Sequence, residues 1–110
     1  MIAEQFSLKG KVAIVTGGGK GIGKAIGLVF AEAGANIVFA ARTQGDLDTA
    51  VAQAKAFGVD AIGVNCDVLI DEQLQQLVDQ TIVHFGRIDI LVNNAGGTMP
   101  KPMENISANS

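Results

Sequence analysis

A glycine-rich stretch near the start of the chain has the composition of an anion-binding turn. Residues Thr16–Gly23, with the sequence TGGGKGIG, lie between an apolar run and a segment of helical periodicity. At such a strand-to-helix junction, backbone N–H groups and the helix dipole attract negative charge. We expect Gly17 to allow the tight turn, Gly21 to admit a pyrophosphate and Gly23 to let the helix pack closely. The alternative is a glycine loop that only connects two elements.

The same stretch nearly matches the P-loop of nucleoside triphosphatases, in which a serine or threonine after the lysine ligates magnesium. Here Gly18 is followed by four residues, then Gly23, Lys24 and Ala25, and alanine has no oxygen to offer. The apolar runs that end at Ala41 and Asn93 also lack the acidic residue that would hold the metal. The triphosphatase interpretation is therefore disfavoured. The general G-x-G-x-x-G dinucleotide spacing is not met either.

Four short, nearly continuous apolar runs predict the strands of a buried parallel sheet. They are Lys11–Thr16, Asn36–Ala41, Ala61–Asn65 and Ile88–Asn93. The segments between them carry apolar residues at helical spacing. These predicted helix faces consist of Ile22, Ile26, Val29, Phe30 and Ala33, then Leu47, Ala50, Val51, Ala54 and Phe57, then Leu74, Leu77, Val78, Ile82 and Phe85. Thr43 and Asp46 predict a capping box at the second helix.

The alternation of strands and helices predicts an α/β fold, because right-handed crossovers wind such a chain into an open parallel sheet. We expect a three-layer Rossmann-type sheet with strand order 3-2-1-4, the first half of a doubly wound fold. Residues 1–96 would form a dinucleotide-binding unit. Residues 97–110 contain both prolines and predict a loop that leads to a C-terminal half not contained in this chain.

Composition excludes several classes of partner. The 110 residues have 48% apolar and 17% charged content and a net charge of −3, with no basic stripe for nucleic acid or anionic lipid. Cys66 is the only cysteine, so no internal disulfide or thiolate metal site is expected. No apolar stretch reaches the roughly 18 residues of a membrane span. We therefore expect a cytoplasmic protein without a bound metal.

Four motifs together resemble the short-chain dehydrogenase/reductase family. They are T-G-x-x-x-G-x-G at Thr16–Gly23, the pair Asp67-Val68, N-N-A-G at Asn93–Gly96, and Leu8–Ala13 leading into the first strand. The resemblance implies hydride transfer between a nicotinamide cofactor and a small-molecule carbonyl or alcohol substrate, by a protein that forms a homo-oligomer at full length. Taken singly, the asparagines could satisfy backbone groups at a strand end, and Asp67 could cap a turn.

The resemblance also assigns roles to individual residues. Ile22 and the neighbouring backbone would hold the pyrophosphate, and Asp67 and Val68 the adenine. Asn94, Ala95 and Gly96 would lie on the nicotinamide ribose side. The full set of expected cofactor-binding residues is Thr16, Gly17, Gly19, Lys20, Gly21, Ile22, Gly23, Arg42, Asp67, Val68, Asn94, Ala95 and Gly96.

The residues after the second apolar run favour NADP over NAD. NAD sites commonly place a carboxylate about 20 residues past the glycines to bind the ribose 2′-hydroxyl, and Ala41 takes that position here. Arg42 follows it, and Lys20 lies in the glycine turn, so two cations are available for a 2′-phosphate. The alternative is that both are solvated or paired with Asp46 and Asp48.

The residues that perform the family's chemistry are missing. The resemblance implies a tyrosine acid/base with a lysine four residues on and a serine upstream, yet the chain has no tyrosine. His84 fits a role at a helix C-terminus, and Cys66 fits a buried core position. We assign no catalytic residue and expect the chain alone to be inactive, with a non-catalytic nucleotide-binding module as the alternative. As an exposed sheet edge, the apolar run Ile88–Val92 predicts self-association.

Overall fold

The computed structural model describes residues 7–94. Within this range the elements are β1 (Val12–Thr16), α2 (Gly21–Glu32), β2 (Asn36–Ala41), α3 (Gln44–Lys55), β3 (Ala61–Asn65), α4 (Asp71–Phe85) and β4 (Ile90–Asn93). The predicted site residues Ala95 and Gly96 and the predicted loop 97–110 lie outside the described residues. No helix in the described range is long and apolar enough to cross a membrane.

The four strands form one parallel sheet in the order β3-β2-β1-β4, which confirms the predicted topology. β1 lies in the interior of the sheet, with Thr16 beside Ala40 of β2 and Asn93 of β4. Because all strands run the same way, their carboxyl ends share one edge, where open α/β sheets bind ligands. The glycine turn, Gly17–Gly23, follows β1 at this edge.

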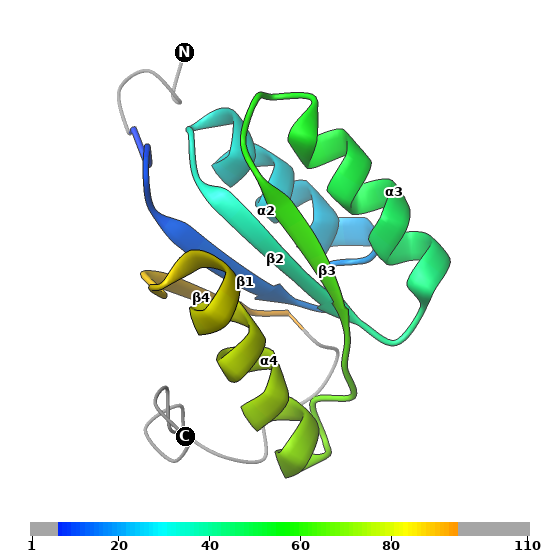
Figure 1. Ribbon diagram of the computed structural model, residues 1–110. Coiled ribbons are helices and arrows are strands. Elements are labelled where there is room, and N and C mark those ends of the chain that lie inside the picture. The colour runs from blue at the N-terminus through cyan, green and yellow to red at the C-terminus, as the bar shows by residue number, and fades with distance from the viewer. Residues whose placement is uncertain (1–6, 95–110) are drawn as a thin grey trace.

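Helices cover both faces of the sheet, as the predicted three layers require (Figure 1). On one face, α2 and α3 contribute Ala31, Leu47, Ala50 and Ala54 to a buried cluster around Phe39 of β2. On the other face, α4 packs Leu74 and Leu77 against Ile14, Val38 and Val64. The continuous apolar runs of β1 and β2 are explained by this two-sided burial.

Only part of the predicted face of α2 is correct, since Phe30 packs against the core cluster but the fully buried positions of the helix differ. Its buried residues are Gly23, Gly27 and Ala31, whereas Ile22 and Val29 are 71% and 56% exposed. A row of small residues lets the helix backbone approach the sheet closely. A prediction based on the spacing of large apolar residues cannot detect a contact that is made by glycine. The faces of the other two helices are mostly as predicted, but Phe57 lies beyond α3 and is 48% exposed.

Three local details also differ from prediction. Thr43 is the N-cap of α3 but makes no side-chain capping hydrogen bond, so the capping box with Asp46 is absent. Strand β1 begins at Val12, and β4 begins only at Ile90. β4 starts late because the Asp89 carboxylate, rather than a ladder bond, receives the N–H of Val12 at 2.9 Å.

Candidate nucleotide-binding site

The glycine turn joins β1 directly to α2, as predicted. Lys20 is the N-cap of α2, and the N–H of Lys24 makes the first bond of the helix, to the Lys20 carbonyl. Gly21, Ile22 and Gly23 come before Lys24 in the first turn of the helix, so their N–H groups have no acceptor within the helix. Gly21 has a φ of 64°, and a side chain there would meet open space. An anion can therefore reach the backbone at this point.

Gly23 marks the closest approach in the site. A Cβ at this position would overlap the carbonyl oxygen of Gly17 and lie 2.8 Å from Nδ2 of Asn94. The start of α2 thus packs on the turn and on the residue after β4. This contact brings two motifs that are distant in sequence, the glycine turn and the asparagine pair, into one place.

The hydroxyl of Thr16 joins the ends of β1 and β4. Its Oγ1 lies 3.3 Å from the Val92 carbonyl oxygen and 3.2 Å from Oδ1 of Asn93, and it accepts the Asn94 N–H at 3.1 Å. Thr16 is fully buried. Its side chain therefore positions the asparagine pair rather than facing a ligand, and Asn93 satisfies a group at the strand end.

The end of β2 borders the turn on its other side. A Cβ at Gly19 would lie 3.2 Å from Cβ of Ala41 and 2.9 Å from Cβ of Asp46. Lys20 and Arg42, the neighbours of Gly19 and Ala41, are both exposed. Within residues 7–94 neither cation forms an ion pair, and Asp48 instead accepts a hydrogen bond from Gln44 at 2.8 Å.

Asp67 and Val68 are linked to the same edge through β3. The N–H of Cys66 donates to the Ala41 carbonyl at 2.9 Å, which aligns the residues after β3 with the end of β2. Asp67 does cap a turn, since its Oδ1 accepts the Leu69 N–H at 3.0 Å. Val68 is half-buried against the core beneath α4.

Cys66 is buried in the core, and His84 is paired with Asp60. Burial, and then the charge of Asp67, raise the pKa of the Cys66 thiol above its ordinary value, so it stays protonated. His84 has its Nε2 2.8 Å from Oδ2 of Asp60, the residue before β3, and thus lies at the opposite edge of the sheet from the glycine turn. Residues 7–94 contain no group of side chains suited to a metal ion.

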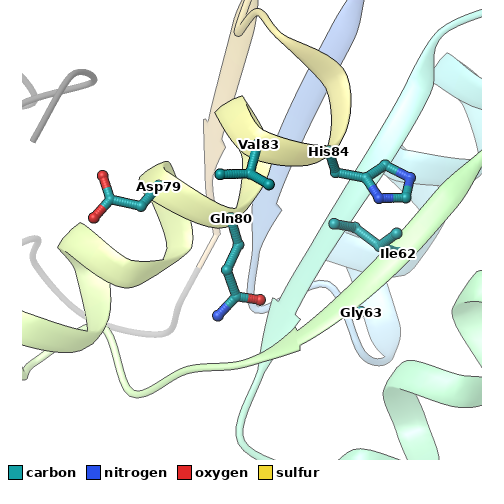
Figure 2. A pocket seen from close by; sticks show the side chains of 6 residues that line it. All are labelled: Ile62, Gly63, Asp79, Gln80, Val83 and His84. Atoms are coloured by element: carbon teal, nitrogen blue, oxygen red, sulfur yellow. The ribbon is translucent and has the colours of Figure 1, made fainter.

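A surface groove of about 620 Å³ lies away from the predicted site. Figure 2 shows it between β3, which carries Ile62 and Gly63, and α4, which carries Asp79, Gln80, Val83 and His84. None of its lining residues belongs to the motifs.

Sequence reasoning missed two neighbours of the turn. Asp46 packs against Gly19, and the ring of Phe39 lies against Gly18. Two sequence features hint at these contacts: the expected pairing of β1 with β2, and the glycines within α2. Neither feature predicts the contacts themselves, because these depend on the distance between the helices and the sheet.

The sheet order, the helix start and the converging motifs define a Rossmann-type nucleotide-binding unit. The family model for short chain dehydrogenases matches residues 11–110. The 7alpha-hydroxysteroid dehydrogenase of Escherichia coli (strain K12) is 40% identical over 102 residues, which is 93% of this chain and 40% of that protein. This chain belongs to the short chain dehydrogenase family, whose members use a nicotinamide cofactor.

Solved structures agree with this assignment. L-Sorbose reductase from Gluconobacter frateurii, complexed with NADPH and L-sorbose, has a TM-score of 0.80 at 39% identity, covering 93% of this chain and 39% of that one. NAD+-bound xylitol dehydrogenase has a TM-score of 0.78 at 40% identity, covering 81% and 34%. The chain therefore spans about two fifths or less of the length of these relatives.

Proposed function

We propose that the protein is an NADP-dependent oxidoreductase that transfers a hydride between the nicotinamide and a small-molecule carbonyl or alcohol. The observation that carries the proposal is the glycine turn, where a side chain at Gly21 would meet open space and the start of α2 packs against Asn94 at Gly23. A nicotinamide dinucleotide, when bound, would supply the hydride chemistry. The residues described in this chain would bind and orient it.

The proposed binding roles follow the geometry of the strand ends. The N–H groups of the turn would hold the diphosphate, with Ile22, 71% exposed, covering it on the solvent side. Asp67 uses Oδ1 for its own turn, and its Oδ2 makes no hydrogen bond within residues 7–94, so it is available to the adenine amino group. Asn94, followed by Ala95 and Gly96, would face the nicotinamide ribose. Val68 would contact the adenine ring.

The preference for NADP rests on charge at the end of β2. Ala41 supplies no carboxylate for a ribose 2′-hydroxyl, and Arg42 and Lys20 are exposed on either side of the contact between Ala41 and Gly19. Since one of the two solved relatives above holds NADPH and the other NAD+, family membership leaves the choice open. Two charge-assisted bonds to a 2′-phosphate, each worth about 1.5 to 3 kcal/mol, would favour NADP.

The rest of the proposal concerns the whole protein. We place the catalytic acid/base group outside residues 1–110, since the chain has no tyrosine. We also propose a homo-oligomeric, cytoplasmic protein, with the solitary cysteine suited to a reducing compartment.

Two measurements on the source protein test this function. Its intact mass is compared with the 11.3 kDa of this chain, and NADPH oxidation is followed with a panel of carbonyl compounds. A mass about two and a half times that value, as expected from a chain that covers 40% of its relative, together with turnover would support the enzyme. A mass equal to that of this chain, with NADPH binding but no turnover, would instead favour a non-catalytic nucleotide-binding module.

A further inference from the structure

The largest fully buried side chain of the described residues, Phe39, lies beneath the glycine turn. It occupies the middle of β2 and pairs with Val15 of β1. Its ring fills the space that side chains would take at two buried glycines, Gly18 in the turn and Gly27 in the middle of α2.

The contacts with the two glycines involve different parts of the ring. A Cβ at Gly18 would lie 2.8 Å from Cδ1 of Phe39, whereas a Cβ at Gly27 would lie 2.9 Å from Cζ and would overlap Cε1. The turn is also bonded to the same strand, because the Gly18 N–H donates to the Ala40 carbonyl at 3.1 Å. The Phe39 ring therefore sets the distance of both the turn and α2 from β2.

We propose that Phe39 is a positioning residue for the diphosphate-binding turn: its ring holds the turn and the middle of α2 at the spacing that places the N–H groups of the turn around one anion. This inference rests on the proposed function, since it assumes that a dinucleotide binds there. The site offers backbone groups, which cannot adjust through a change of rotamer. Their placement depends on what lies underneath, and displacement by about 1 Å can cost up to about 100-fold in a positioned site.

The first test replaces the ring in the full-length protein. Leucine keeps a carbon near the place of Cδ1 but has none at Cε1 or Cζ, so Phe39→Leu empties the space beside Gly27. We expect the affinity for NADPH to fall about tenfold. The affinity for 2′-AMP, which has the adenosine and 2′-phosphate but no diphosphate, should change less than about twofold.

A matched control distinguishes positioning from a general loss of stability. Val38 is equally buried in the same strand but packs on the opposite face, in the cluster beneath α4. Val38→Ala should lower the urea midpoint while leaving both affinities unchanged. If Phe39→Leu is poorly folded, Phe39→Met provides a milder change at the same place, with an expected loss for NADPH of about threefold.

A second substitution should restore the lost contact. Gly27→Ala alone should weaken NADPH binding, because its methyl group overlaps the ring. In combination with Phe39→Leu the methyl group enters the vacated space, and we expect the affinity to return to within about threefold of wild type. Such a reversal of sign is not expected from two independent core defects.

The outcomes separate this inference from the proposed function. If the wild-type protein binds neither NADPH nor NADH, the proposed function fails and the inference fails with it. If the wild-type protein binds NADPH but Phe39→Leu weakens NADPH and 2′-AMP equally, or Gly27→Ala restores nothing, Phe39 is only a core residue and the inference alone is wrong.

Discussion

Gly21 and Gly23 take different parts in the turn because their surroundings differ. At Gly21 the backbone is left-handed and faces open space, so the absence of a side chain lets a ligand approach. At Gly23 the space is already taken by the Gly17 carbonyl and the Asn94 amide. The first glycine admits the ligand, and the second allows the motifs to meet.

We therefore expect Gly23→Ala to reduce both stability and nucleotide affinity. The added methyl group must displace backbone, which should cost about 1 to 3 kcal/mol of unfolding free energy and at least about tenfold in NADPH affinity. Gly45→Ala in α3 is the control, because a Cβ there meets nothing within 4 Å. Denaturant titration and NADPH titration of both variants provide the measurement. Wild-type binding by Gly23→Ala would contradict the close-packing role.

Arg42 provides the test of cofactor preference. Removal of its charge by Arg42→Ala should lower the ratio of NADPH to NADH affinity by at least about tenfold. Lys55→Ala, which removes an exposed cation from the last turn of α3, should leave the ratio unchanged. The two dissociation constants are measured for each variant by nucleotide fluorescence. An unaltered ratio in Arg42→Ala would exclude Arg42 from a 2′-phosphate site.

Much of the candidate site was predictable because it consists of backbone and strand-end positions. Thr16, Gly23 and Asn94 meet as expected, since Thr16 ends β1, Asn94 follows β4 and Gly23 lies in the helix that comes after β1. The position of Phe39 was not predictable. Its ring contacts Gly18 and Gly27, which lie 21 and 12 residues before it in the sequence. Only the close spacing of the helix layer and the sheet brings these residues together.

At the scale of elements, the unpredicted feature is the packing of α2. Periodicity selects the apolar residues Ile22 and Val29 for the buried face, whereas the helix buries glycine and alanine. The order of the strands was more secure, because continuous apolar runs separated by helices leave few arrangements that satisfy right-handed crossovers. Helix α4, which has large apolar residues in contact with the sheet, was predicted correctly.

Helix α4 is tied to β3 by the pair His84 and Asp60, and this tie should weaken in acid. The hydrogen bond with His84 holds the pKa of Asp60 below its ordinary value of 3.8, against the opposing effect of partial burial. A depressed carboxyl pKa contributes stability at higher pH and loses it as the pH falls through the folded-state value. The contribution is thus lost below about pH 3.8.

The variant Asp60→Asn should remove this dependence. Because both side chains are nearly half exposed, we expect the stability difference from wild type above pH 5 to be at most about 1 kcal/mol. The difference should shrink toward zero as the pH falls below 3.8 and through the lowered pKa of Asp60, as measured by urea unfolding across the range. A constant difference at every pH would show that ionisation of the Asp60 carboxyl does not contribute.

At the scale of the whole molecule, β4 forms an edge of the described sheet. Its Ile90, Leu91 and Val92 are only half-buried, and β1 is its only partner strand within residues 7–94. Apolar edges of this kind pair with other chains. The relatives are longer proteins, of which this chain covers about two fifths.

We accordingly expect the isolated 110-residue polypeptide to self-associate. Sedimentation at two concentrations should show species larger than a monomer. Leu91→Lys, on the edge, should reduce the association, whereas Val83→Lys, which adds the same charge at a residue of α4 that is 86% exposed, should not. A monodisperse monomer that melts cooperatively would contradict the edge-strand argument.

The position of β1 between β2 and β4 also bears on the order of folding. β2 pairs with β1 after one short crossover, but the contact from Thr16 to Asn93 spans 77 residues of chain. Pairings so distant in sequence form late, because the entropy of closing the intervening chain must be overcome first. Asn94 would then join a glycine turn that already packs on β2. A nucleotide that contacts both the turn and Asn94 would slow the local unfolding of β4 from the native sheet.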